Sequence, residues 1–371
     1  MIFDQVKDVP KSRLMSIISS TLKWEEHCGN LSGNSSFDLL HGQIPAETAA
    51  PTSLDKFPKI CYKSVKLPTG SNAECAGFSP NGEYFIVGTA DGFLEVWNPF
   101  EGILRTDLPY QNGEHDLMTM KHTITCISFS SDSEFMICGT IEGEVGVWKL
   151  STGKLIKSFL NVHQNGITSV SFSADQQSLL TTGFDNNVHI LGMKSGRILK
   201  ELRGHTSYVN CAIWLDESTI LSGSHDGTVK LWDLNKLECL NTSIPKEEKS
   251  LSPPPIKSIS HLFSTEFDTF YLVTTQSTKL HLFSILKRDF VQIIPTKLKL
   301  EVNLMNSIVR KGLIFSLTTD GHLFTIKSED FKSSTGYEKV SQVEPIGFTL
   351  HPNLNILVTF DVSGEVKFWR S

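Results

Sequence analysis

Short apolar segments of strand length, separated by turn residues, recur through most of the chain. The clearest unit runs from Gly204 to Asp233 and reads GHTSYVNCAIWLDESTILSGSHDGTVKLWD. Its pattern predicts strands at 209–214, 219–224 and 229–232, and residues 237–242 can add a fourth on the outside. Asp226 and Gly227 predict a tight turn between the second and third strands, because glycine tolerates a positive φ there.

This unit carries the signature of a WD40 repeat, which forms one four-stranded blade of a β-propeller. The signature consists of the Gly-His pair, the Trp-Asp pair and an Asp-Gly turn six residues before Trp232. We expect a middle-strand hydroxyl, Ser222 or Ser224, to bridge the Trp232 indole to His205, while Asp226 accepts from His205. A catalytic Ser-His-Asp set is the competing interpretation. A structural clasp is favoured, because repeat architectures of this kind usually only bind.

The same unit recurs from about residue 59. If the position of Trp232 is taken as a marker, successive markers are 51, 43, 41, 51, 43 and 43 residues apart, close to the period of one blade. The markers are Trp97, Trp148, Leu191, Trp232, Phe283, Ile326 and Trp369. First strands are expected at 75–78, 124–129, 167–172, 209–214, 259–263, 300–304 and 346–350. The sequence therefore predicts an all-β fold, a seven-bladed WD40 β-propeller with a short N-terminal helical extension.

The seventh unit stops after its third strand, and an early segment can complete it. Residues 59–66 alternate like a strand and precede the first unit. We expect this closing strand to join the two ends of a propeller that spans 59–371, because closure removes exposed sheet edges. Two longer intervals, residues 109–121 and 244–256, are expected to be exposed insertions.

The first 29 residues are expected to form an N-terminal extension. A helix is predicted at 11–28, where Ser12 can cap it and Leu14, Ile17, Ile18 and Leu22 form an apolar stripe. Residues 30–58, rich in Ser, Gly, Pro and Ala, are expected to be a linker.

Composition narrows the possible functions. The net charge of −6 argues against broad binding to DNA or RNA, so no sequence-specific nucleic-acid contact is expected. The seven cysteines form no C-x-x-C pair, which favours free thiols in a reducing compartment over a disulfide framework or a zinc site. No signal peptide and no run of 18 apolar residues is present, so no membrane partner is expected.

The motifs of common enzyme classes are missing: there is no G-x-S-x-G elbow, no P-loop and no H-E-x-x-H. No catalytic residue, metal or cofactor is expected. A hydrolase on a propeller would need carboxylates that converge at the mouth, whereas the acids at the turn positions here fall one to a blade. Phe184, Tyr208 and His225 form a candidate partner-binding rim; alternatively, each packs within its own rim.

Several stretches point to one family. They are VPKSRLMSIISSTLKWEEHCG at 9–29, DKFP at 55–58, AECAGFSPNGEYFIVGTADGFLEVWN at 73–98 and MKSGRILKELRGH at 193–205. Together they resemble the SMU-type spliceosomal WD40 proteins, partners of the RED protein. The resemblance covers roughly residues 9–243, and the last three units follow it more by period than by identity.

The resemblance implies a nuclear, non-enzymatic scaffold in pre-mRNA splicing. It would contact a RED-like protein and other spliceosome components during spliceosome activation. The family normally begins with a LisH/CTLH helical module that dimerises and holds RED, and this chain starts just past the place where that module would end. The oligomeric state is therefore left open. The alternative function is a WD40 substrate receptor of a ubiquitin-ligase complex.

Overall fold

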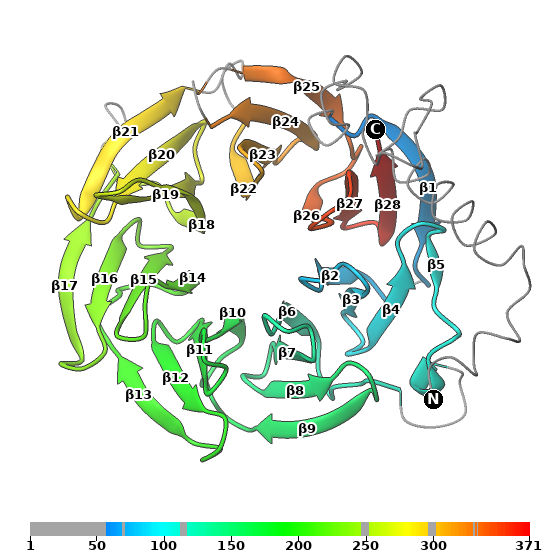
Figure 1. Ribbon diagram of the computed structural model, residues 1–371, viewed down its shortest axis with the longest axis horizontal. Helices are drawn as coiled ribbons and strands as arrows, with labels where there is room; N and C mark the ends of the chain where they lie inside the picture. Colours follow the sequence, from blue (N-terminus) through cyan, green and yellow to red (C-terminus); the bar gives the residue numbers. More distant parts are fainter. Residues whose placement is uncertain are drawn as a thin grey trace, which may run out of the picture.

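The computed structural model describes residues 57–68, 71–111, 117–245, 252–295, 302–328, 331 and 333–371. These residues form seven four-stranded antiparallel sheets arranged in a ring (Figure 1). The predicted all-β, seven-bladed fold is confirmed. The helix predicted at 11–28, and the linker predicted at 30–58 up to residue 56, lie outside the described residues. Within the described ranges, no helix is long and apolar enough to cross a membrane.

Each sheet is one blade, and its first strand lies nearest the centre of the ring (Figure 1). Blade 1 contains β2 (Ala73–Phe78), β3 (Phe85–Thr89), β4 (Leu94–Asn98) and β5 (Ile103–Leu104). Blade 2 contains β6 (Ile124–Phe129), β7 (Phe135–Thr140), β8 (Val145–Lys149) and β9 (Lys154–Phe159). Blade 3 contains β10 (Ile167–Phe172), β11 (Ser178–Gly183), β12 (Val188–Gly192) and β13 (Ile198–Leu202). Blade 4 contains β14 (Val209–Trp214), β15 (Thr219–Ser224), β16 (Val229–Asp233) and β17 (Glu238–Ser243). Blade 5 contains β18 (Ile256–Ser264), β19 (Thr269–Thr275), β20 (Lys279–Ser284) and β21 (Asp289–Pro295). Blade 6 contains β22 (Leu304–Arg310), β23 (Leu313–Thr318), β24 (His322–Lys327) and β25 (Ser333–Lys339). Blade 7 contains β26 (Pro345–Leu350), β27 (Ile356–Asp361), β28 (Glu365–Arg370) and β1 (Ile60–Lys66). A short 3-10 helix, η3 (Pro109–Gln111), follows β5.

The core lies between neighbouring blades. Leu180 and Val188 of blade 3, for example, share one apolar cluster with Val209, Ile220 and Trp232 of blade 4. Each blade thus buries one face against the blade before it and the other against the blade after it. Since burial of apolar surface stabilises a fold by roughly 25 cal/mol per Å², every blade depends on having two neighbours.

Hydrogen bonds between neighbouring blades add to this packing at the β-bulge that each first strand carries. The Thr125 hydroxyl of blade 2 donates to the Ile167 carbonyl of blade 3 at 2.5 Å. In the same way, the Asn210 amide of blade 4 donates to the Ile256 carbonyl of blade 5 at 2.5 Å. The extra residue of the bulge therefore turns its side chain toward the next blade and fixes the spacing between blades.

The two ends of the ring meet in blade 7. β1 pairs antiparallel with β28, from Ile60 opposite Arg370 to Lys66 opposite Glu365 (Figure 1). The Tyr62 hydroxyl also donates to the carbonyl of Pro99 in blade 1. A segment that precedes the first blade thereby becomes the outermost strand of the last one.

A buried histidine joins blade 7 to blade 1 at this seam. The Nε2–H of His351 donates to the Gly82 carbonyl at 3.2 Å, and its Nδ1 accepts from the backbone N–H groups of Asn353 and Leu354 at 3.1 and 2.9 Å. These bonds require the neutral ring. Burial lowers the pKa of His351 to about 4, so the ring is neutral at physiological pH.

The first strand predicted for the sixth blade, 300–304, is wrong. β22 begins at Leu304 and reaches Arg310, which pairs with Leu313 of β23. The turn fixes this register: Lys311 and Gly312 both have positive φ, 46° and 77°, as a two-residue hairpin turn requires. A Lys-Gly pair is a weaker turn signal than Asn-Gly. The apolar alternation at 300–304 is the stronger pattern in the sequence, so it predicts a strand that begins too early.

The two predicted insertions are not wholly exposed. Met118 and Met120 are buried, and the backbone of the same segment bonds to β4 and its preceding turn through Leu94 N–H to Met118 O and Met120 N–H to Gly92 O. Met120 precedes β6 by four residues, just as His205 precedes β14, so it takes the histidine's place in its blade. At the end of the second insertion, Pro254 and Ile256 are buried as well.

Removal of β1 is expected to open the ring. A chain that starts at Leu67 lacks β1 and exposes the edge of β28, whereas a chain that starts at Phe57 keeps it. We expect the shorter chain to melt at a lower temperature than the longer one and to aggregate at the same concentration. Thermal melting and light scattering measure the difference. Equal melting of the two chains would contradict the closure.

The neutral His351 predicts acid sensitivity of the seam. Its pKa is about 4 in the folded chain, and an unfolded histidine titrates near 6.5, so between these values only the unfolded chain takes up the proton. The contribution of His351 to the free energy of unfolding is therefore fully present above about pH 6.5. It falls by up to roughly 3 kcal/mol as the pH decreases toward about 4. Urea denaturation at several pH values measures it. His351→Gln should be less stable at pH 7 but lose less stability on acidification, and parallel pH profiles would count against the assignment.

Candidate functional site

The four residues predicted as a clasp come together in blade 4. Trp232 Nε1–H donates to the Ser222 Oγ at 2.8 Å, and that hydroxyl lies 2.8 Å from His205 Nε2. His205 Nδ1 lies 3.0 Å from Asp226 Oδ2. One arrangement of protons satisfies every group: the hydroxyl donates to Nε2, and Nδ1–H donates to the carboxylate. Ser224, the other hydroxyl considered, bonds instead to the carbonyls of Ser207 and Tyr208.

The environment of this clasp suits structure rather than catalysis. Burial alone would raise the pKa of Asp226, but hydrogen bonds from His205, Thr228 and Thr206 outweigh it and lower that pKa, so the carboxylate is charged. Ser222 has no exposed surface. Because a nucleophile must reach its substrate, the buried hydroxyl has no access to one, and the clasp holds the first, second and third strands in register.

The three rim residues also come together, and they span two blades. The rings of Tyr208 and His225 stack with centroids 4.4 Å apart, and Phe184 lies against Tyr208 at 5.4 Å. Phe184, from the turn between β11 and β12 in blade 3, is 41% exposed, whereas Tyr208 and His225 of blade 4 are half-buried. Burial and nearby Lys257 of blade 5 lower the pKa of His225, so its ring is neutral at physiological pH. We call Phe184, Tyr208 and His225 the rim cluster.

A backbone hydrogen bond repeated in every blade places the rim cluster on one face of the ring. In each blade, the residue after the second strand donates its N–H to the carbonyl of a residue just before the first strand. The donors are Ala90, Ile141, Phe184, His225, Gln276, Thr319 and Val362. Ile141 of blade 2 and Val362 of blade 7 are exposed like Phe184, so this face presents apolar side chains from three blades.

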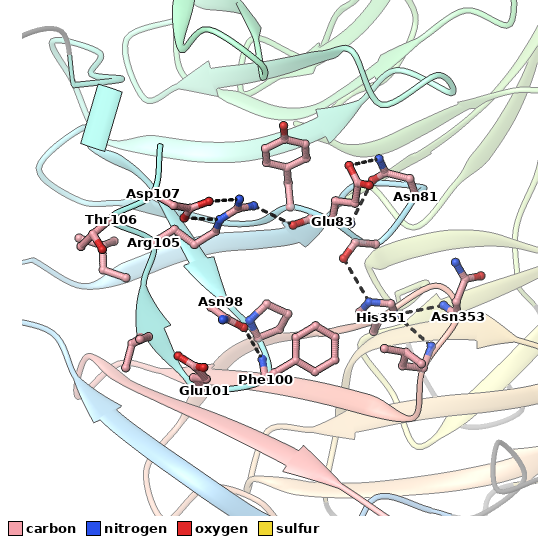
Figure 2. A pocket seen from close by; sticks show the side chains of 16 residues that line it. Asn81, Glu83, Asn98, Phe100, Glu101, Arg105, Thr106, Asp107, His351 and Asn353 are labelled. Carbon is pink, nitrogen blue, oxygen red and sulfur yellow. Dashed lines mark hydrogen bonds and ion pairs between the residues drawn. The ribbon is translucent and has the colours of Figure 1, made fainter. Parts of the chain in front are cut away.

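A groove at the seam was missed by the sequence reasoning (Figure 2). It has a volume of about 830 Å³ and lies between β4, β5 and the turn after β26. On one wall, Arg105 forms an ion pair with Asp107 at 2.6 Å and donates to the Glu83 carbonyl at 3.2 Å. His351 lies on the opposite wall. β5 has only two residues, whereas the other outer strands have five to seven, and this short outer strand leaves room for the groove. In the sequence, the only sign of the groove is the weak strand alternation after Gly102.

Blade 3 solves the clasp differently. His163 Nδ1 lies 2.8 Å from Asp185 Oδ1 and its Nε2 lies 3.0 Å from Thr181 Oγ1, but Leu191 occupies the marker position and offers no donor. His189 stacks on His163 instead, with ring centroids 4.3 Å apart and planes 12° apart. His163 and Asp185 were predicted from the sequence, whereas His189 was not. The only signal for His189 is that it lies two residues before Leu191, the marker position where the tryptophan is missing.

Comparison with known proteins places the chain in a family. A model described as WD domain, G-beta repeat matches residues 196–233, and one described as Vps8 beta-propeller matches residues 73–208. The WD40 repeat-containing protein smu1 of Dictyostelium discoideum is 32% identical over 372 residues, which cover 99% of this chain and 69% of that protein. The chain belongs to the smu1-type family of WD40-repeat proteins.

Other relatives match shorter parts of this smu1-type chain. WD repeat-containing protein 18 of Bos taurus is 26% identical over 46% of this chain and 43% of its own length. The DDB1- and CUL4-associated factor 11 homolog of Caenorhabditis briggsae is 31% identical over 34% of this chain and 24% of its own length. The match to smu1 thus extends along nearly the whole chain, whereas the matches to these two proteins each cover less than half of it.

Removal of the bridging hydroxyl tests the clasp. Ser222→Ala leaves the buried donors and acceptors of His205 and Trp232 without their partner, so we expect the free energy of unfolding to fall by about 1–3 kcal/mol. Thr242→Ala, on the exposed outer strand of the same blade, is the control. Urea denaturation measures both. A loss in Ser222→Ala no greater than that in the control would show that the clasp does not stabilise the blade.

Proposed function

We propose that this protein is a non-enzymatic interaction scaffold of the pre-mRNA splicing machinery in the nucleus. It would hold a RED-like protein and other spliceosomal components during spliceosome activation. Similarity to smu1 along 99% of the chain carries the proposal, together with the family resemblance of residues 9–29 and 73–98. A role in binding rather than catalysis is supported by the buried Ser222 and by acids at the turn positions that lie on separate blades.

The rim cluster is the proposed contact with a partner. Phe184 offers an exposed aromatic face, and the stacked Tyr208 and His225 hold their rings in place beside it. Rigid aromatic side chains make strong anchors because little conformational entropy is lost when a partner covers them. The cluster spans two blades, so a partner bound there would contact both of them at once. Its binding would therefore depend on the assembled ring and not on a single repeat.

A pull-down from nuclear extract tests this function. Tagged wild-type protein should recover spliceosomal proteins, and a variant with Phe184→Ala, Tyr208→Ala and His225→Ala should recover at least about tenfold less, since aromatic anchors often contribute more than 2 kcal/mol. Leu199→Ala, which removes an exposed apolar side chain from outer strand β13, is the matched control and should behave as wild type.

Each outcome decides a part of the proposal. If wild type recovers no spliceosomal protein, the role in splicing is wrong. If a ubiquitin-ligase scaffold is recovered in their place, the protein is a substrate receptor. If the triple variant recovers as much as wild type, the splicing role stands but the rim cluster is not its contact.

A further inference from the structure

A lysine in blade 5 lacks a partner at a position where other blades use a polar side chain. In blades 2 to 4 the bulge residues of the first strands, Thr125, Thr168 and Asn210, each donate a hydrogen bond to a carbonyl of the next blade. Lys257 is the bulge residue of β18. Within the described part of the chain, it donates no such bond and forms no ion pair with a carboxylate. Its ammonium group is therefore left without an acidic partner.

This ammonium group is also partly removed from water. Lys257 is half-buried, and burial lowers its pKa because a charged group loses hydration there. An anion that approaches the group would replace the lost hydration with a charge-assisted hydrogen bond. Such a bond is stronger where water is partly excluded than at a fully solvated lysine.

Lys257 borders the rim cluster. The segment that leads into β18 packs against the turn that carries His225, since a Cβ atom on Gly227 of that turn would lie 2.6 Å from the Cβ of Pro253. Lys257 follows in the same segment and lies close enough to lower the pKa of His225. Asp226, the acid of that turn, accepts its hydrogen bonds from side chains and backbone of blade 4. The aromatic rings therefore have a cation without an acidic partner beside them.

We propose that this face binds a linear segment of a protein partner that brings a carboxylate to Lys257 and an apolar side chain to Phe184. The inference rests on the proposed function, because it names the chemistry of the segment that the rim cluster would contact. Charge complementarity favours an acidic segment, since a basic one would be repelled by the ammonium group. Single-stranded RNA is disfavoured, because it is usually bound by several cations and the chain has a net charge of −6.

The geometry of the face sets the spacing of the two groups on the partner. Contacts run from Phe184 through Tyr208 to His225, with ring centroids 5.4 and 4.4 Å apart, and Lys257 lies beyond His225 in the next blade. An extended chain advances by about 3.3 Å per residue. The carboxylate and the apolar side chain are therefore expected about three or four residues apart.

The repeat itself supplies variants for a test. The bulge position of Lys257 is occupied by Met305 in blade 6 and by Ile346 in blade 7, so the fold accepts an apolar side chain there. Lys257→Met is therefore expected to fold as wild type does. Blade 1 has Glu74 at the same position, half-buried like Lys257 but in a blade that contributes nothing to the rim cluster. Glu74→Gln is the matched control.

A peptide array tests the proposal independently of splicing. Short peptides of random sequence, acetylated and amidated so that no terminal charge contributes, are immobilised and exposed to the labelled full chain. Wild type should retain peptides enriched in an acidic residue about three or four positions from an apolar one. Lys257→Met should lose the acidic preference and keep the apolar one, whereas Phe184→Ala should do the reverse.

Fluorescence anisotropy with the best-retained peptide measures the effect in solution. Lys257→Met should bind this peptide at least about tenfold more weakly than wild type, because a charge-assisted hydrogen bond is lost. Added salt should weaken binding by wild type more than binding by this variant. Glu74→Gln should bind as wild type does.

Several results would overturn the proposal. They are the absence of retained peptides, retention without an acidic preference, and an acidic preference that Lys257→Met keeps. Equal weakening by Glu74→Gln would overturn it too, because the effect would not be specific to Lys257. Tighter binding of a single-stranded RNA oligonucleotide than of any acidic peptide would show that the face recognises nucleic acid instead. The role in splicing is decided separately, by the spliceosomal proteins that wild type recovers from nuclear extract.

Discussion

The pairing of β1 with β28 is the contact on which the rest of the ring depends. It joins residues about 300 positions apart in the chain, as the hydrogen bond from Ser64 to Glu365 shows with a separation of 301. Because each blade buries both faces against its neighbours, an open stack would leave the outer faces of its first and last blades bare. Closure gives every blade two neighbours, and His351 fixes the seam by bonding to the Gly82 carbonyl of blade 1.

Within the closed ring, individual blades tolerate different polar interiors. Blade 4 has the full clasp, and blade 7 keeps a partial one, in which Trp369 Nε1–H donates to Thr359 and Ser341 bonds to Asp361. Blade 2 places the apolar Met120 where the histidine would be. Because apolar packing between blades supplies most of the stability, a lost clasp is tolerated when a group of suitable shape fills its place. The proposed partner-binding rim lies between blades 3 and 4, which differ in this way.

Much of this architecture could be predicted from the sequence because a repeat multiplies a weak signal. One strand pattern is ambiguous, but seven at a regular period agree on the same fold. The clasp of blade 4 was predictable because its partners fall at fixed positions of the repeat, although the sequence left the bridging hydroxyl open between Ser222 and Ser224. The start of β22 was not, because the Lys311-Gly312 turn that sets its register is a weak signal. The seam groove and His189 depend on contacts between segments whose distance no local pattern encodes.

Hydrogen exchange measured on peptides from residues 60–66 and 365–370 tests the closed ring most directly. We predict that the amides of β1 that bond to β28 are protected to the same extent as those of β28, and that both exchange only when the whole ring opens. Rapid exchange of residues 60–66 beside a protected blade 7 would contradict it, because β1 would then not be a working strand of the ring.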